Sequence, residues 1–344
     1  YSINTALDSN SYLSFQVANY RKPEINLQVN FTEEQIQAGD KLHATVQARY
    51  FYDAPANNLE AHWALYRTRA FFDLPGYQVG KVDTSWLDAF RYPEWFTNLG
   101  ELVDEGQANT DAQGLLALEF PTQPADERYQ YSLEVTLTDE SGLPVSARSS
   151  ALVNPDAFYI GIRPDTWVGR AGEQAGFDVL IVDWQQNPTG ADNLRAEFQK
   201  VVWRRIDPPV NQPYESPKFE PQYTPAGSAD FAADAQGRAR LAFTPTEPGT
   251  YLLDVYNRQA AQGKGARSQF LLWVGGAGQA VWPNLPNSRL LLVSDRAGYQ
   301  PGDTAQVFIP NPFGKTVQAL LTVERSIVMK HEILSIPVEG YDLS

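Results

Sequence analysis

Short runs of alternating apolar and polar residues, separated by turn-forming residues, dominate this chain. The alternation is clearest at residues 129–139 and recurs at residues 305–309 and 318–323. With a period of two, one side chain points towards a core and the next points towards solvent, as a half-buried antiparallel strand requires. Turn signals return every ~8–12 residues, and no convincing amphipathic helix intervenes. The pattern therefore predicts an all-β fold of tandem antiparallel β-sandwiches of the immunoglobulin or fibronectin-III type.

The predicted strands form three groups with a common order. Two segments depart from the regular pattern. Residues 70–109 are rich in aromatic side chains and are compatible with a hairpin plus a short helical turn around residues 86–90, whereas residues 206–229 read as a Pro- and Tyr-rich insertion. The predicted strands are residues 11–17, 25–29, 42–50, 59–67, 115–120, 129–139, 144–153, 158–162, 176–183, 194–205, 238–243, 249–257, 268–274, 290–293, 305–309 and 318–323.

Turn motifs repeat along the chain at a nearly constant distance. Glycines followed by Asp or Glu stand at Gly39, Gly172 and Gly302, which are 133 and 130 residues apart. The tetrapeptide Asp-Ala-Gln-Gly occurs at residues 111–114 and 234–237, 123 residues apart. A period near 130 residues exceeds the 20–50 residues of solenoid repeats, so each copy is expected to be a domain with its own core.

The repeat divides the chain into four predicted parts. Residues 1–18 are expected to hold the C-terminal strand of a preceding domain. Residues 19–154 and 155–283 are each expected to form a complete sandwich. Residues 284–344 are expected to begin a further domain that is incomplete, because a full sandwich needs about 100 residues.

Composition narrows the classes of partner. A hydrophobic content of 43% can build ordinary cores, so disorder is not expected. The net charge of −14 and the pI near 4.7 argue against nucleic acid or an anionic membrane surface as partner. No apolar run approaches the ~20 residues that span a bilayer. The chain has no cysteine, which excludes disulfides, cysteine-ligated metals and a cysteine nucleophile within these residues.

The residues that could carry chemistry do not assemble into a recognisable motif. His43 and His62 lie on neighbouring predicted strands, so a metal pair is conceivable, but neither has a partner at ligand spacing in the sequence, and His331 stands alone. Acidic pairs such as Glu33-Glu34 lie in predicted turns, where charge is normally solvated. No nucleophile elbow, zinc motif or phosphate loop is present. We therefore predict no catalytic residue, no cofactor-binding residue and no metal ligand, and hence no enzyme.

Two further interpretations stay open at this point. Asp111 and Asp234 could begin calcium loops, although a polar turn capped by Asp explains them without further ligands. The aromatic segment from Phe71 to Phe96, which includes Trp86 and Trp95, could be a platform for sugars, although such insertions also bury aromatic rings to cover a sheet edge.

Several motifs, in order and spacing, resemble bacterial alpha-2-macroglobulins over nearly the whole chain. The first is similar to the start of the third macroglobulin domain of that family, and the last resembles the start of its bait-region segment. The motifs are Phe15-x-Val17-x-x-Tyr20-Arg21-x-Pro23-Glu24, Asp111-x-x-Gly114, Asp234-x-x-Gly237, Pro248-Gly249-x-Tyr251, Leu272-Trp273-Val274-x-Gly276, and Leu292-Val293-x-Asp295-x-x-x-Tyr299-x-Pro301-Gly302-Asp303 with Leu321-Thr322-Val323-Glu324-Arg325.

The resemblance implies a structural role within a broad-spectrum protease inhibitor. In this family a protease cuts an exposed bait region, and the macroglobulin-like domains then rearrange around it. It implies proteases as partners, through regions outside this chain, and a bacterial envelope, periplasmic or secreted location, with a lipid anchor on the parent protein left open. No functional residue is carried over. The alternatives are an adhesin or surface stalk of tandem immunoglobulin-like modules, and a carbohydrate-binding accessory module.

Overall fold

The structure is a computed structural model that describes residues 2–5, 8–14, 24–82, 100–138, 142–207, 218–276, 290, 292–294, 299–311 and 313–343. It is built almost entirely from antiparallel sheets, which confirms the predicted all-β sandwich class. Near the N-terminus, β1 (Ser2–Thr5) and β2 (Asp8–Ser14) pair only with each other among these residues. None of the described residues form a helix that is long and apolar enough to cross a membrane.

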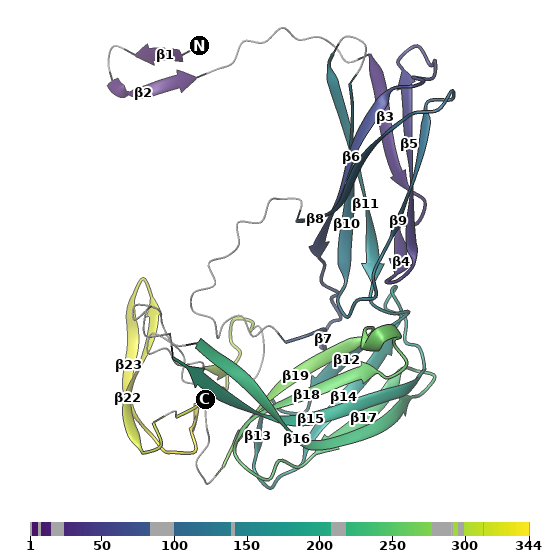
Figure 1. The fold of residues 1–344 in the computed structure, drawn as a ribbon. Helices are drawn as coiled ribbons and strands as arrows, with labels where there is room; N and C mark the ends of the chain where they lie inside the picture. Colours follow the sequence, from purple (N-terminus) through teal and green to yellow (C-terminus); the bar gives the residue numbers. More distant parts are fainter. Residues whose placement is uncertain are drawn as a thin grey trace.

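The first sandwich packs a five-stranded sheet against a three-stranded sheet (Figure 1). Its core is closed by fully buried side chains such as Leu42, Leu65 and Leu133, each at most 1% exposed. One sheet has the order β4-β11-β10-β6-β8 and the other β3-β5-β9. The strands are β3 (Ile25–Phe31), β4 (Gln35–Gln37), β5 (Lys41–Tyr50), β6 (Glu60–Arg69), β8 (Glu101–Asn109), β9 (Leu115–Pro121), β10 (Tyr129–Thr138) and β11 (Pro144–Asn154).

The second sandwich repeats this topology strand for strand. Its sheets have the orders β13-β19-β18-β15-β16 and β17-β14-β12. The strand β7 (Gln78–Val79), which belongs to the first repeat, pairs with the free edge of β12. The short strands β4 and β13 pair in parallel with β11 and β19, respectively. The strands are β12 (Tyr159–Pro164), β13 (Val168–Arg170), β14 (Ala175–Val182), β15 (Ala191–Ile206), β16 (Lys218–Ala233), β17 (Arg238–Phe243), β18 (Gly249–Asn257) and β19 (Arg267–Gly275), with a 3-10 turn at Ala261–Gly263.

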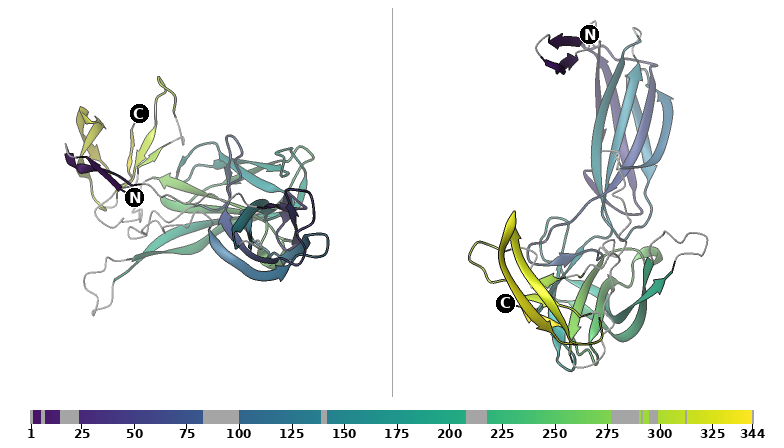
Figure 2. Two further views of the ribbon diagram at one scale, coloured as in Figure 1. Left: turned by 90° about the horizontal axis from the view of Figure 1, so that it is seen from above. Right: turned by 90° about the vertical axis from the view of Figure 1, so that its left-hand side faces the viewer.

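The third copy of the repeat contains two smaller sheets. Its strands β20 (Val293–Ser294), β21 (Val307–Ile309) and β24 (Tyr341–Leu343) form one sheet, and β22 (Val317–Arg325) and β23 (Ile327–Ile336) form a hairpin. The hairpin stands beside the second sandwich in Figure 1, and Figure 2 gives two further views of it. The predicted boundaries near residues 18 and 283 lie outside the described residues, and the boundary at residue 154 stays a prediction.

Three long strands and several short ones were not predicted from the sequence. The segment 206–229 is not simply an insertion, because β16 runs through its second half and pairs with β15 along its length. Likewise β8 ends the aromatic-rich segment, and β23 follows β22 directly. Strand β16 lies at the end of its sheet and tolerates Pro221 and Pro225, because an edge strand needs donors on one side only. The predicted helical turn at residues 86–90 lies outside the described residues.

Candidate functional site: the junction between the two sandwiches

Residues 70–82, here called the strap, leave β6 of the first sandwich and cross to the second. Within the strap, β7 pairs antiparallel with β12, placing Val79 opposite Gly161 and Gln78 opposite Ile162. The first repeat thus contributes an edge strand to the second sandwich (Figure 1). This placement gives the two sandwiches a hydrogen-bonded connection in addition to the covalent linker at residues 154–159.

The strap packs closely because the facing strand carries a glycine. A Cβ at Gly161 would lie 2.7 Å from Leu74 Cδ2 and 2.9 Å from Tyr77 Cβ, closer than real Cβ contacts allow. Leu74 is buried in one hydrophobic cluster with Tyr159 and Val182 of the second sandwich. The Phe72 ring stacks on the Tyr159 ring, with centroids 3.7 Å apart.

Hydrogen bonds fix the end of the strap on β19. Gly80 N donates to Ser268 Oγ over 2.8 Å, and Gln269 N donates to Gly80 O over 2.9 Å. The Ser268 hydroxyl is fully buried and donates in turn to Ile160 O, so one hydroxyl joins the strap to both sheets of the second sandwich. Beyond it, Val82 packs against a buried cluster on the outer face of β15, β18 and β19.

The strap is also held by the first sandwich. Lys81 Nζ lies 2.6 Å from Asp126 Oδ2. Burial would by itself raise the pKa of Asp126, but the hydrogen bond and charge of Lys81 outweigh it, so this pKa lies below its ordinary value. Arg128 donates to Phe71 O and lies over the Phe72 ring. Both sandwiches therefore contact the same segment of thirteen residues.

Most of the linker is buried, and its buried polar side chains are hydrogen-bonded. Asn154, the last residue of β11, is 0% exposed and accepts a hydrogen bond from the Tyr159 hydroxyl. Burial raises the pKa of Tyr159 above its ordinary range. Asp156 is 7% exposed and accepts hydrogen bonds from Asn257 Nδ2 at 2.9 Å and from Ala266 N at 3.1 Å. Bending this linker would be costly, because its buried polar groups would lose their hydrogen-bond partners.

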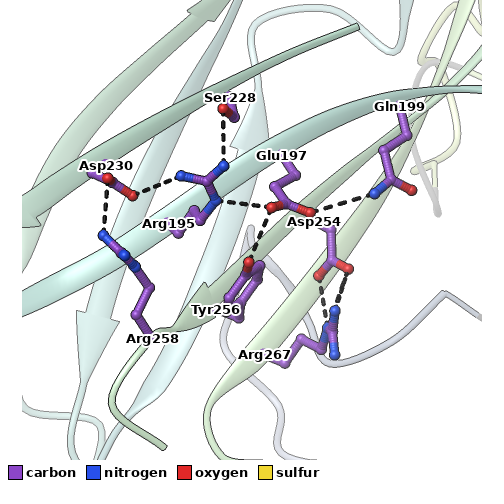
Figure 3. A network of polar contacts seen from close by, with 9 residues as sticks. All are labelled: Arg195, Glu197, Gln199, Ser228, Asp230, Asp254, Tyr256, Arg258 and Arg267. Carbon is purple, nitrogen blue, oxygen red and sulfur yellow. Dashed lines mark hydrogen bonds and ion pairs between the residues drawn. The ribbon is translucent and has the colours of Figure 1, made fainter. Parts of the chain in front are cut away.

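A network of charged side chains covers the outer face of the second sandwich near the strap (Figure 3). Arg195 donates to Glu197 over 2.8 Å and to Asp230 over 3.1 Å. The hydrogen bond from Arg195 is the main cause that lowers the pKa of Glu197. Asp254 is 4% exposed and receives a two-pronged pair from Arg267, whose pKa is raised mainly by that hydrogen bond. These pairs tie β15, β16, β18 and β19 together, which suits a stiff sheet.

The histidines that the sequence offered as a possible metal pair, His43 and His62, each lie near acidic side chains. His43 Nδ1 lies 3.1 Å from Glu33 Oε1 and its Nε2 lies 3.6 Å from Glu119 Oε2, so His43 does have acidic neighbours that the sequence did not indicate. His62 Nε2 is 3.9 Å from Glu60 Oε2. Within the described ranges, no group of three or more His, Asp or Glu side chains is arranged to hold a metal ion.

Asp111 and Asp234 form the same turn in the two sandwiches. Oδ1 of Asp111 accepts from Gln113 N and Leu115 N, both at 2.8 Å. Oδ1 of Asp234 accepts from the matching amides two and four residues later, at 2.9 and 2.8 Å. The carboxylates therefore cap backbone donors, as the polar-turn interpretation predicts. The proposed sugar platform at Trp86 and Trp95 lies outside the described residues.

A cleft of about 1410 Å³ opens where the strap, the second sandwich and the third copy meet. Trp167, Arg163 and Phe308 are among its lining residues. Arg170 Nη2 lies 3.5 Å from Asp342 Oδ2 across the contact between the second and third copies, and both side chains are largely exposed. An exposed ion pair of this kind contributes little to stability. A buried apolar cluster of Trp273, Val293 and Phe308 joins the third copy to the second more firmly than this ion pair does.

Sequence reasoning did not find the strap. The only signal was the density of aromatic residues in the segment that contains Phe72 and Tyr77, which favoured an edge cover and left a sugar platform as the alternative. The contacts of the strap with the second sandwich join residues about 80 to 190 positions apart, and no local pattern encodes such pairs.

The two sandwiches of common topology are macroglobulin-like β-sandwich domains in tandem. Residues 24–155 match the family model of the bacterial alpha-2-macroglobulin MG5 domain. The alpha-2-macroglobulin homolog of Nostoc is 23% identical over 87% of this chain and 15% of its own length. The alpha-2-macroglobulin of Escherichia coli K12 is 23% identical over 99% of this chain and 21% of its own length. The chain therefore spans about a fifth or less of these relatives.

The fold agrees with a solved structure of Escherichia coli alpha-2-macroglobulin activated by porcine elastase, with a TM-score of 0.51 at 17% identity over 98% of this chain and 34% of that one. The comparisons therefore support the bacterial alpha-2-macroglobulin family, which the sequence motifs resemble. One detail of the sequence interpretation was wrong, because the first complete sandwich matches MG5 and not a third macroglobulin domain.

Proposed function

We propose that the two sandwiches form a stiff arm of a protease-trapping alpha-2-macroglobulin, which supports the bait region and transmits the effect of its cleavage. The observation that carries this proposal is the strap, which both sandwiches grip through Lys81, Leu74 and Gly80. The relative from Escherichia coli, whose structure was solved after activation by porcine elastase, supports a protease as the trigger.

Stiffness matters because a relay works only if its parts move as units. If the linker at residues 154–159 bent freely, a displacement at one end of the arm would be absorbed there. The buried hydrogen bonds of Asn154 and Asp156 and the strap both oppose such bending. Domain rearrangement would then occur at the contacts of this arm with other parts of the protein.

The test uses the full-length protein that contains this chain, treated with porcine elastase or trypsin. We expect both proteases to cut first in one common segment outside residues 24–276, followed by compaction in small-angle X-ray scattering. Cuts scattered over the surface, with no compaction afterwards, would favour a passive stalk and contradict the proposal.

A second measurement addresses the arm itself. Leu74→Ala removes a buried strap side chain, whereas Phe71→Ala removes one that is 88% exposed in the same strap. We expect Leu74→Ala to slow or reduce compaction without changing the rate of bait cleavage, and Phe71→Ala to leave both unchanged. Equal behaviour of the two variants would show that the strap does not serve the relay.

We also propose that the parent protein acts outside the bacterial cytoplasm, in the periplasm, at the envelope or as a secreted protein, because its substrates would be foreign proteases. Cell fractionation with an antibody against residues 24–155 tests this location. Recovery of the protein with cytoplasmic markers only would contradict it.

A further inference from the structure

The last strands of the two sandwiches end at equivalent positions, so the linkers that follow them can be compared residue by residue. Strand β11 ends at Asn154 beside β4, and β19 ends at Gly275 beside β13, each in a parallel pair. The carbonyl of Asn154 accepts a hydrogen bond from Ala38 N over 2.7 Å. The carbonyl of Gly275 accepts the matching bond from Ala171 N over 2.9 Å. Gly275 is therefore the counterpart of Asn154.

Side chains hold the first linker in place. Asn154 is 0% exposed, reaches Gln35 Oε1 with its amide nitrogen and accepts the hydroxyl of Tyr159 with its amide oxygen. The ring of Pro155 fixes the next φ, and Asp156 is held by the hydrogen bonds described above. Rotation within this linker would therefore break buried hydrogen bonds.

The second linker starts with two glycines. Gly275 has no side chain, so it can make none of the side-chain hydrogen bonds that Asn154 makes. Gly276 stands where Pro155 stands in the first linker, and its φ of 153° is one that other residues rarely adopt. The sequence continues with residues 277–278, Ala-Gly, so that three of the four residues from Gly275 onward are glycine. The position that is most restricted in the first linker is thus the least restricted in the second.

Packing does not require a glycine at position 275. The backbone of Gly275 lies outside the left-handed region. A Cβ there would lie 3.6 Å from the carbonyl oxygen of Glu339 and 3.7 Å from the Phe308 ring, which are ordinary contacts. Gly161 differs, because a Cβ there would clash with the strap. A glycine that neither conformation nor space demands contributes backbone freedom.

The third copy meets this linker through a compact apolar contact. Phe308 is 4% exposed and packs with Trp273 and Val293 in one buried cluster. Its ring lies beside Gly275 and also beside Gly340, where a Cβ would come within 2.6 Å of the ring. On these two sides the ring meets backbone and has no side chain to interlock with.

We propose that Gly275 and Gly276 form a hinge, about which the third copy turns relative to the stiff pair of sandwiches, with the Phe308 ring as the pivot. Hinges of this kind are a few residues at the end of an element that absorb a change in φ and ψ. The cluster around Phe308 stays buried during the turn, and the exposed pair of Arg170 and Asp342 separates at little cost. The use of the hinge in the relay rests on the proposed function, whereas its existence rests on the comparison of the two linkers.

Distances between spin labels in the full-length protein, before and after elastase treatment, test the hinge. One pair, at Gln130 and Arg238, spans the first junction, and the other, at Arg238 and Lys315, spans the second; all three positions are exposed. The labels are attached to introduced ketone side chains, so that cysteines outside this chain do not react. We expect the second pair to give a distance distribution about twofold wider than the first, or a mean that elastase shifts while the first stays constant. A second pair as narrow and as constant as the first would overturn the proposal.

The same measurement separates the hinge from the relay. Compaction after cleavage with unchanged label distances across both junctions would contradict the hinge and leave the relay standing. A wide distribution across the second junction, with no compaction after cleavage, would contradict the relay and support the hinge.

Two matched substitutions test the glycine itself. Gly275→Ala removes backbone freedom at the proposed hinge, whereas Gly169→Ala removes it within the paired strand β13, where the new methyl group would lie 3.6 Å from Leu272. We expect Gly275→Ala to narrow the distribution across the second junction by about a quarter or more and Gly169→Ala to leave it unchanged. The melting temperatures of both variants should stay within about 2 °C of the wild type, because neither methyl group clashes. Equal widths in the two variants would rule out Gly275 as the hinge residue.

Discussion

The hydroxyl of Tyr159 donates a hydrogen bond to Asn154 Oδ1 over 2.5 Å and so ties the first strand of the second sandwich to the last residue of the first. Asn154 is fully buried, and its Nδ2 reaches Gln35 Oε1 and Ile36 O in the first sandwich. One amide side chain therefore connects the two cores. The junction is set by residues only five positions apart, yet its stiffness depends on partners more than a hundred positions away.

Tyr159→Phe should destabilise the junction, because Asn154 Oδ1 loses its hydrogen-bond donor in a buried place. The expected cost is about 1–3 kcal/mol in the free energy of unfolding, measured by urea denaturation. The aromatic ring remains, so the stacking on Phe72 is retained and the hydroxyl alone is tested.

Tyr129→Phe is the matched control. The Tyr129 hydroxyl reaches Glu127 at 3.3 Å in a partly exposed place, where water can replace it. We expect a change below about 0.5 kcal/mol. If Tyr159→Phe cost no more than this control, the hydrogen bond to Asn154 would not hold the junction.

Gly161→Ala should loosen the strap. The backbone at Gly161 is ordinary, so the effect comes from the clash of the new methyl group with Leu74 and Tyr77. Overpacking of this kind costs about 1–3 kcal/mol. We expect faster hydrogen exchange and easier proteolysis within residues 70–82.

Gly169→Ala provides the comparison for this substitution. Its added methyl group would lie 3.6 Å from Leu272 Cδ2, which is an ordinary contact. Exchange in the strap should stay unchanged in this variant. Equal loosening in both variants would show that the close approach of strap and strand is not what Gly161 permits.

Gly114→Ala should destabilise the first sandwich more than the same substitution at an ordinary turn glycine does. Gly114 has a φ of 74°, and a methyl group there would also overlap the carbonyl oxygen of Ala48. Gly142→Ala carries a similar conformational cost at a φ of 80° but meets no atom within 4 Å. We expect about 1 kcal/mol for Gly142→Ala and at least about 2 kcal/mol for Gly114→Ala in thermal unfolding.

The second sandwich offers an equivalent glycine on which the Gly114 prediction can be tested again. Gly237 of the second sandwich has a φ of 73°, and its added methyl group would overlap the carbonyl oxygen of Ile181. Gly237→Ala should therefore behave like Gly114→Ala. A cost no larger than that of Gly142→Ala in both repeats would contradict the close approach as the reason for these glycines.

Asp178 should make the second sandwich sensitive to acid. The hydrogen bond from Arg163, helped by Arg240, lowers the pKa of Asp178. A lowered folded-state pKa means that the stabilisation is fully present above the unfolded value of about 3.9 and is lost as the pH falls through the folded-state pKa. Because the side chain is 38% exposed, solvent screening limits the contribution to about 1 kcal/mol or less.

Urea midpoints at pH about 5 and about 3 measure this contribution. We expect the wild type to lose more stability over this interval than Asp178→Asn, and the difference to shrink in about 0.5 M salt. Identical pH dependence of the two proteins would show that the pairs with Arg163 and Arg240 do not stabilise the fold.

The sequence by itself determined the all-β class, most strands and the repeated turns, because these are local properties. Alternation with a period of two selects a half-buried strand, and a positive φ selects Gly39, Gly114, Gly172, Gly237 and Gly302. The Asp-capped turns at Asp111 and Asp234 also follow from residues four positions apart or fewer.

Only the tertiary structure decided how the repeats are joined. Strands β8 and β16 have mostly exposed side chains, so their pairing depends on the backbone of a neighbour and leaves little hydrophobic pattern in the sequence. The apolar residues of β23 gather towards its two ends and do not alternate. The strap depends on the fit of Leu74 and Tyr77 to a glycine in another repeat, and His43 meets Glu119 across two paired strands. Such contacts arise only when distant segments fold together, and for that reason the junction was not visible in the sequence.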